Sequence, residues 1–424
     1  MDDSTAPDLL SDLPLSIIEI ILILLPIRDA VRTSVLSSKW RYRWASIPEL
    51  AFSDSCVNFS HDKDISEGRL VNFITHALLL HQGPIHKFKV CSSVLQGCPD
   101  VDQWLLFLSR NNVRGLTLEL GGSDEWVRVP SCLFSCKYLT HLELSRFELD
   151  PPSTFKGFPC LKTLNLQQVF MAHEAIESLI SSCPLLESLT LYYFDGWDLN
   201  IYAPNLKFLC LEGEFKKICL EKTPQLEVMV ITLYTNPDEV QEENLEQSFG
   251  CTYAKFLGGV PNLTRLSGHV YFTKYLSIGI DQWRPQVTYD HLKIIELQQV
   301  SFEDINEILV VIRLITNSPN LEELHISGSP NTAPAIEASD LDFWKPRCPS
   351  DCTLKRLKTV MMTDLNGVPH EMEFIRFLLG NSPVLEKMSI APSTYVTDGR
   401  VDMLVELVRF RRASPLAEIL FIQL

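Results

Sequence analysis

Basic residues are scarce in this sequence. It holds 37 lysines and arginines against 53 aspartates and glutamates, a formal net charge of −16 at pH 7. An acidic surface repels phosphate backbones, so we expect no nucleic acid as the principal partner. General disorder is excluded because 46% of the 424 residues are apolar. A chain this long exceeds what one compact core usually supports, which leaves several domains or an elongated repeat architecture.

The sequence also lacks a membrane-spanning segment and a secretory leader. Its most apolar run, Leu13 to Leu25, is about thirteen residues long, whereas a helix that spans a bilayer needs about 20. Four aspartates precede this run, where a signal peptide would be basic, and no small-residue cleavage site follows it. We therefore expect an intracellular protein, nuclear or cytoplasmic, that is neither secreted nor bound to a membrane.

The 12 cysteines follow no ligand or disulfide pattern. Cys132 and Cys136 form one close pair along the chain, and Cys348 and Cys352 form another. The two pairs are far apart, and no histidine lies at zinc spacing beside either of them. We expect buried, reduced thiols, no metal and no cofactor.

Catalytic motifs are missing as well: the sequence has no phosphate-binding loop, zinc-ligand helix, nucleophile elbow or paired dinucleotide glycines. One pair that could supply a general base is His173 with Glu174. A second is His370 with Glu371. Both pairs lie at the start of expected helices, where acids favour the helix dipole and histidines are commonly exposed. We therefore expect no enzyme.

The strongest local signal lies between Asp8 and Pro48. From Leu13 to Leu25 only Glu19 is charged, and apolar residues go all the way round a helix rather than along one stripe. Leaving five such side chains in water would forfeit about 1.5 to 3 kcal/mol each. Two interpretations remain: a buried core helix, or a small helical module that packs on its own companions with one face and on a permanent partner with the other. We favour the second.

The same stretch carries a family motif. Its positions are Leu13-Pro14, Ile17-Ile18, Ile21-Leu22, Leu25-Pro26, the run from Asp29 to Ser37, and Trp40-Arg41 with Trp44. This pattern resembles a plant F-box over about forty residues without a gap. Leu15 and Ser16 depart from it, because the family usually has an acidic pair there that caps the first helical turn.

The resemblance implies a three-helix module that docks on the Skp adaptor of a cullin-RING ubiquitin ligase. The residues expected to bind the adaptor are Leu13, Pro14, Ile18, Ile21, Leu22, Leu25, Pro26, Val35 and Trp40. Trp44 is expected to help join the module to the rest of the chain. The second half of the module is basic, through Arg28, Arg32, Lys39, Arg41 and Arg43. A DNA-reading helix-turn-helix is an alternative for this patch, but an acidic adaptor is the better match.

Behind the module an apolar triplet of the form Leu-x-x-Leu-x-Leu recurs. The triplets begin at Ile85, Val113, Leu139, Leu161, Leu186, Leu206, Leu226, Leu263, Leu292, Leu321, Leu357, Leu385 and Leu416. These first positions lie mostly 20 to 31 residues apart, the spacing of leucine-rich repeats. The last two apolar positions of each triplet alternate with polar ones, which predicts a short strand with one face in a core.

Helical patterns separate many of the triplets, as in residues 173–184, 304–320 and 371–384. One repeat alone cannot bury both a strand and a helix, so we predict a curved α/β solenoid with parallel strands inside and helices outside. Between Leu206 and Leu226 there is no room for a full helix, and short turns are expected there.

Two long interruptions break the repeats, at residues 235–250 and 327–351. Each is either a partner-binding insertion or a solvated loop, and we favour the loop.

The last quarter of the chain is similar to the FBD region of many plant F-box proteins. The matching positions are Leu378, Leu379, Asn381, Leu385, Lys387 and Met388. We predict four regions: an F-box at 8–48, a linker with the first capping elements at 49–84, leucine-rich repeats at 85–344 and an FBD-like region at 345–424 that continues the solenoid.

A solenoid of this class binds with the strand face opposite its core. The candidate substrate-binding residues are Tyr192, Tyr193, Phe194, Trp197, Phe208, Val228 and Val230. Apolar side chains on a face that should be wet indicate a contact patch, and aromatic anchors are typical of interface hot spots. The alternative, that the aromatics fill gaps between uneven repeats, stays open.

The resemblance implies a non-catalytic substrate receptor of a Skp–cullin–F-box ubiquitin ligase, whose repeats bind an unknown target protein. One alternative is a small-molecule sensor of the plant hormone receptor type. Those receptors hold a polyanion in basic pockets, whereas Lys87, Lys89 and Lys387 are among the few bases on this strand face. Another alternative is a scaffold that recruits partners without ubiquitylation.

Overall fold

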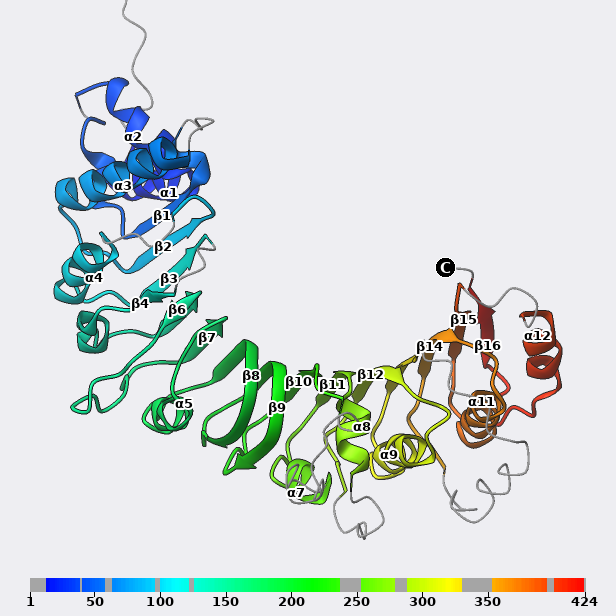
Figure 1. Ribbon diagram of the computed structural model, residues 1–424. Helices are drawn as coiled ribbons and strands as arrows, with labels where there is room; N and C mark the ends of the chain where they lie inside the picture. The colour runs from blue at the N-terminus through cyan, green and yellow to red at the C-terminus, as the bar shows by residue number, and fades with distance from the viewer. Residues whose placement is uncertain are drawn as a thin grey trace, which may run out of the picture. The chain divides into compact units, whose positions relative to one another are not determined.

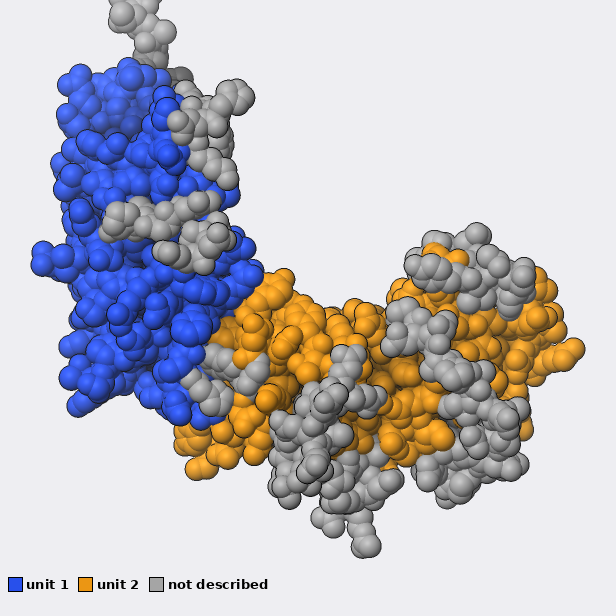
Figure 2. Space-filling model, in the orientation of Figure 1, with its two compact units in different colours: residues 1–190 blue, residues 191–424 orange. Residues whose placement is uncertain are grey.

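The computed structural model describes residues 13–38, 40–57, 63–95, 100–121, 126–236, 253–278, 288–329, 353–394 and 400–422. The chain falls into two compact units, residues 1–190 and 191–424, which are drawn in different colours in Figure 2. Each unit is described by itself.

The first unit begins with a small helical module. It comprises α1 (Leu15–Leu24), α2 (Ile27–Arg32) and two 3-10 helices, η1 (Thr33–Val35) and η2 (Arg43–Ser46). Pro14 and Pro26 stand directly before α1 and α2, where a missing backbone N–H costs nothing. The resemblance implies three helices, but the described part of the module has two α-helices followed by two short 3-10 helices. We refer to residues 13–48 as the module.

Parallel strands follow the module in the first unit. They are β1 (Glu49–Ser53), β2 (Lys87–Ser92), β3 (Gly115–Leu120), β5 (His141–Ser145) and β7 (Thr163–Gln167). The remaining elements are η3 (Asp54–Cys56), α3 (Lys63–Leu80), α4 (Val101–Arg110), η4 (Ser131–Ser135), α5 (His173–Ser181) and the short pair β4 (Val127–Arg128) and β6 (Phe147–Glu148). The hydrogen-bonded order is β1-β2-β3-β5-β7. In Figure 1, α4 and α5 lie on the same side of these strands.

The second unit repeats the same alternation. Its strands are β8 (Ser188–Tyr202), which crosses the unit boundary, β9 (Phe208–Glu221), β10 (Val228–Leu233), β11 (Arg265–Val270), β12 (Ile294–Val300), β13 (Glu323–Gly328), β14 (Thr359–Leu365), β15 (Lys387–Pro392) and β16 (Glu418–Phe421). Its helices are α7 (Tyr253–Gly258), α8 (Phe272–Ser277), α9 (Ile305–Thr316), α11 (Pro369–Asn381) and α12 (Arg400–Arg409). The strands pair in chain order, and Figure 1 shows α9 and α11 on one side of β12 to β15.

The predicted triplets form the core. Leu116 of β3 pairs in register with Leu142 of β5, which pairs with Leu164 of β7, and all three are fully buried. Each buried leucine thus stacks on the leucine of the next repeat, and the neighbouring positions of the strand face outward. The predicted parallel strands and the strand–helix alternation are confirmed. The last triplet is an exception, because its first residue, Leu416, is 78% exposed.

The irregular repeats between Leu206 and Leu226 differ from the expectation of short turns. Instead of turning, β8 and β9 continue as strands of 15 and 14 residues. Their second halves take the space that a helix occupies in other repeats. The two strands come very close at Gly213, where a Cβ atom would lie 2.2 Å from the carbonyl oxygen of Phe194. Glycine is therefore required there.

The two interruptions predicted from the sequence lie almost entirely outside the described residues, in the ranges 237–252 and 330–352. The second cysteine pair, Cys348 and Cys352, lies there too. Cys136 is buried and Cys132 half-buried, and both are free thiols, as expected.

Two buried glutamates stabilise the turns that precede helices of the second unit. The Glu371 carboxylate accepts hydrogen bonds from the backbone N–H groups of Asn366 (3.0 Å), Gly367 (2.6 Å) and Val368 (3.1 Å). Burial raises the pKa of Glu371 to about 7, although these donors act in the opposite direction. Glu307 is similar: Thr273 Oγ1 donates to it at 2.6 Å, and burial raises its pKa to about 7.

We expect Glu371→Gln to change how stability depends on pH. The folded state holds a proton that the unfolded state, with an ordinary pKa of 4.5, releases as pH rises toward about 7. This contribution to stability is complete below pH 4.5 and is lost as pH rises through the folded-state pKa. Glutamine keeps an acceptor without a charge. The melting temperature of the variant, relative to wild type, should therefore rise between about pH 5 and 7.5 by scanning fluorimetry.

Glu174→Gln is the matched control for this comparison, because Glu174 is an exposed acid in the first turn of α5. A difference between Glu371→Gln and wild type that stays constant with pH would contradict the prediction.

Candidate functional site

Helix α1 exposes most of its apolar side chains. Ile18 and Leu22, one turn apart, are 3% and 0% exposed and face α2 and η2, against which α1 packs. The exposed apolar residues, which we name the α1 face, are Leu15, Ile17, Ile20, Ile23 and Leu24. Leu24 is 79% exposed. A contiguous apolar patch of this kind on a folded protein marks an interaction site.

The nine predicted adaptor-binding residues fall into two groups. Ile18, Leu22 and Trp40 are buried within the module, so in this structure they support the surface from inside and are not themselves accessible to a partner. The other six reach the surface: Pro14, Pro26 and Val35 are exposed, and Leu13, Ile21 and Leu25 are half-buried. Val35 is 86% exposed, and its neighbour Leu36, which the motif did not select, is also exposed.

The sequence did contain one signal for the outer side of α1. Glu19 is its single charged residue and is exposed. Leu15 and Ile23 lie four residues before and after Glu19, on the same side of the helix. This one carboxylate indicated that the side carrying Leu15 and Ile23 faces water, but it did not show which of the other apolar residues face the module.

The basic residues of the module lie mostly at the surface. Arg41 and Arg43 are exposed, and Arg32 pairs with Asp29 at 3.4 Å. Lys39 lies outside the described residues. A positive rim beside the apolar α1 face suits an acidic partner surface.

The module is joined to the first repeat by backbone hydrogen bonds around Trp44, which is buried in η2. The Ala45 carbonyl accepts from Gln82 N–H at 2.7 Å, and the Pro48 carbonyl accepts from His86 N–H at 2.7 Å. The predicted joining role of Trp44 is consistent with this position.

The predicted substrate-binding residues are divided by the structure. Phe208, Val228 and Val230 are half-buried on the outward face of β9 and β10, where Val228 pairs with Phe208. Tyr192 is half-buried and Tyr193 exposed, and these two also reach the surface.

Of the two remaining aromatics, the described structure places the side chain of one. Phe194 is 2% exposed, so it fills space inside the repeats, and for this residue the gap-filling alternative holds. The side chain of Trp197 lies outside the described residues.

Polar groups that the motif analysis missed border this patch on the same strand face. The Tyr234 hydroxyl donates to Glu212 Oε1 at 2.6 Å, and this hydrogen bond raises the pKa of Tyr234 to about 12. Thr232 Oγ1 lies 3.4 Å from His269 Nδ1, while His269 Nε2 is buried with no hydrogen-bond partner among the described residues. We name Phe208, Glu212, Val228, Val230, Tyr234 and His269 the unit 2 strand patch.

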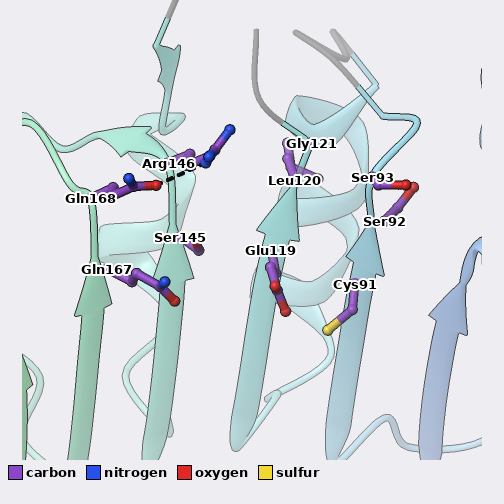
Figure 3. A pocket seen from close by; sticks show the side chains of 10 residues that line it. All are labelled: Cys91, Ser92, Ser93, Glu119, Leu120, Gly121, Ser145, Arg146, Gln167 and Gln168. Atoms are coloured by element: carbon purple, nitrogen blue, oxygen red, sulfur yellow. Dashed lines mark hydrogen bonds between the residues drawn. The ribbon is translucent and has the colours of Figure 1, made fainter. Parts of the chain in front are cut away.

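A hollow lies at the carboxyl ends of β2, β3, β5 and β7, in the first unit (Figure 3). It has a volume of about 430 Å³ and polar walls. On one side Arg146 Nε donates to Gln168 Oε1 at 2.9 Å, and on the other lies Glu119. One cation faces one anion, so the hollow has little net charge.

The described ranges contain neither a cluster of metal ligands nor a helix that could span a membrane. No cluster of three potential metal ligands occurs among those residues. No helix in the same part of the chain is long and apolar enough to cross a bilayer.

The two His–Glu pairs, which the sequence analysis set aside as general bases, differ from each other in exposure. His370 is 5% exposed, so the expected exposure of this histidine is wrong. The Glu371 carboxylate beside it is occupied by backbone donors of the preceding turn. Glu174 is exposed, and the side chain of His173 lies outside the described residues.

The fold and the exposed α1 face define a class: a helical N-terminal module followed by leucine-rich repeats. Family models agree in detail. An F-box domain matches residues 10–50, the LRR repeats of FBD-associated F-box protein At5g56370 match residues 101–326, and an FBD matches residues 345–390.

Curated relatives extend the match to the whole chain. F-box/FBD/LRR-repeat protein At1g13570 of Arabidopsis thaliana is 54% identical over 418 residues, which covers 99% of both chains. F-box/FBD/LRR-repeat protein At5g56420 of the same plant is 29% identical, over 98% of this chain and 99% of its own. The chain belongs to the F-box/FBD/LRR-repeat family, and the resemblance seen in the sequence is confirmed.

Substitutions in α1 should separate core from surface. Leu22→Ala removes a fully buried side chain and should cost about 2 to 5 kcal/mol, whereas Leu24→Ala should change stability by less than about 0.5 kcal/mol. Urea unfolding followed by tryptophan fluorescence measures both, because Trp40 and Trp44 are buried in the module. Equal losses for the two variants would show that Leu24 is packed in the free protein.

Proposed function

We propose that this protein is the substrate-recognition subunit of a Skp–cullin–F-box ubiquitin ligase and performs no chemistry itself. The observation that carries the proposal is the exposed α1 face within the residues that match an F-box. Ubiquitylation would follow from effective concentration, because the module docks on the ligase while the repeats hold the target near the ubiquitin carrier.

The adaptor-binding surface we propose combines predicted and newly identified residues. It consists of Leu13, Pro14, Leu15, Ile17, Ile20, Ile21, Ile23, Leu24, Leu25, Pro26, Val35 and Leu36. Burying these aliphatic groups would supply the hydrophobic part of the affinity. The exposed Arg41 and Arg43 would favour an acidic adaptor and speed its association.

The target-binding surface we propose is the unit 2 strand patch. Phe208, Val228 and Val230 offer apolar contact, and Tyr234 with Glu212 offers polar contact at the rim. A patch with an apolar centre and polar neighbours is typical of protein–protein interfaces. The partner would be a protein segment rather than a nucleic acid, because the chain carries a net charge of −16.

A small-molecule sensor of the plant hormone receptor type receives less support. A polyanion pocket needs several converging cations, but Arg265 on the same strand face is already paired with Glu296 at 2.9 Å. Among the described residues that line the hollow in the first unit, Arg146 is the single base, and Glu119 lies opposite it. A polyanion retained by the purified protein, detected by native mass spectrometry, would reverse this ranking.

Adaptor binding should depend on the α1 face. Ile20→Glu and Leu24→Glu would each place a charge in an apolar contact, and the double variant should weaken binding to a Skp adaptor at least tenfold in biolayer interferometry. Leu106→Glu is the control, because Leu106 is an exposed leucine on α4, outside the module. Adaptor binding that is indifferent to the double variant would refute the proposed surface.

Target capture should depend on the unit 2 strand patch without involving the adaptor. Val230→Glu is expected to leave adaptor affinity unchanged while reducing the targets found by proximity labelling under proteasome inhibition. Thr163→Glu is the matched control, since Thr163 is a half-buried outward residue of β7. An unchanged set of labelled proteins with Val230→Glu would contradict the assignment of the patch.

A further inference from the structure

The last helix of the second unit, α12, is apolar on two sides. Met403, Leu407 and Phe410 are buried, and the guanidinium of Arg376 from α11 lies over the Phe410 ring at 4.7 Å. This side faces the unit's own core. The other side exposes Val401, Leu404, Val405 and Val408, which we name the α12 stripe.

The α12 stripe lacks the polar outer surface that normally closes a stack of repeats. Val401 is 66% exposed and Val408 is 77% exposed. β16 is the last strand in the hydrogen-bonded order, and Leu416 just before it is also exposed. Terminal repeats usually need a polar outer face for solubility, so this apolar stripe calls for a covering surface.

The intervals between the residues of the α12 stripe are the same when read from either end of the helix. Its members occupy positions i, i+3, i+4 and i+7, with an aliphatic residue at each. Two such helices can pack antiparallel about a twofold axis between Leu404 and Val405, and Val401 of one copy then meets Val408 of the other. Such a self-complementary patch is what an isologous dimer requires.

The charges beside the stripe also fit an antiparallel pair. Asp402 and Arg409 are seven residues apart, which puts them on one side of the helix, and both line one hollow of about 620 Å³ together with Val405. Both are exposed, and neither has an ion-pair partner among the described residues. In the antiparallel arrangement, Asp402 of one copy and Arg409 of the other lie about 3 Å apart along the helix axis, at a rise of ~1.5 Å per residue.

We infer that the α12 stripe is the contact surface for a second copy of this chain, through antiparallel packing of α12 against α12. In a parallel pair the twofold axis runs along the helices and puts the charged sides of the two copies on opposite sides of the contact, so Asp402 and Arg409 could not pair between copies. Glu406 does not disturb the antiparallel pair, because Arg376 already binds it at 3.2 Å. The α12 stripe and the α1 face share no residue, so this inference does not rest on the proposed ligase function.

Charge reversal on the full chain tests this inference by sedimentation velocity, at concentrations up to about 100 µM. Asp402→Arg faces Arg409 of the second copy, and Arg409→Asp faces Asp402, so each single variant should raise the dimer dissociation constant about tenfold or more. The double variant Asp402→Arg/Arg409→Asp should restore the wild-type dissociation constant. An equimolar mixture of the two single variants should also dimerise, because opposite charges then meet across the interface.

Central and control substitutions complete the design. Val405→Glu should abolish the dimer, whereas Asp102→Arg and Leu106→Glu, an exposed acid and an exposed leucine of α4, should not affect it. Equal circular dichroism and urea midpoints for all variants exclude unfolding as the cause. A wild-type monomer at every concentration, a dimer that tolerates Val405→Glu, or single variants that neither the double variant nor the mixture rescues would each overturn the inference.

Discussion

A strand–helix repeat of this protein cannot bury its apolar side chains alone, and the rest of the structure depends on this constraint. Leu142 is fully buried because Leu116 and Leu164 lie in register on either side of it. Removing either neighbouring repeat would expose the stacked leucines to water. The apolar surface that remains therefore collects where the stacking stops. In the first unit α2 packs against β1 at that end, whereas in the second unit α12 leaves an apolar stripe exposed.

The same constraint explains why α1 looks unlike the helices of the repeats. In α9 the apolar residues from Ile308 to Ile312, together with Leu314 and Ile315, are all buried within the unit. In α1 only Ile18 and Leu22 are buried within the module, and the larger part of its apolar surface is in contact with water. An exposed apolar surface of this kind indicates an interaction site.

The strands could be predicted from the sequence because their signal is local and repeated. Each apolar triplet alternates with polar residues, and this pattern needs no knowledge of the neighbours. The long strands β8 and β9 could not be predicted, because the lack of room for a helix between Leu206 and Leu226 indicated short turns, whereas the chain continues as long neighbouring strands, and strand pairing is a tertiary effect. The inner side of α1 was equally hidden, since every position but Ser16 and Glu19 is apolar. The burial of Phe194 beside the exposed Tyr193 was also not predicted, and Tyr193 has a φ of 59°, a left-handed conformation that the alternation pattern does not indicate.

The two buried acids of the second unit, Glu307 and Glu371, are held by structural hydrogen bonds. A general base must offer a free lone pair to a substrate proton. The Glu371 carboxylate instead accepts three backbone N–H groups, and Glu307 accepts Thr273 Oγ1 and the N–H of Ser301. Their raised pKa values therefore arise from burial in the turns that they stabilise. On the strand face the Tyr234 hydroxyl likewise donates to Glu212, so these two polar groups are already hydrogen-bonded within the unit.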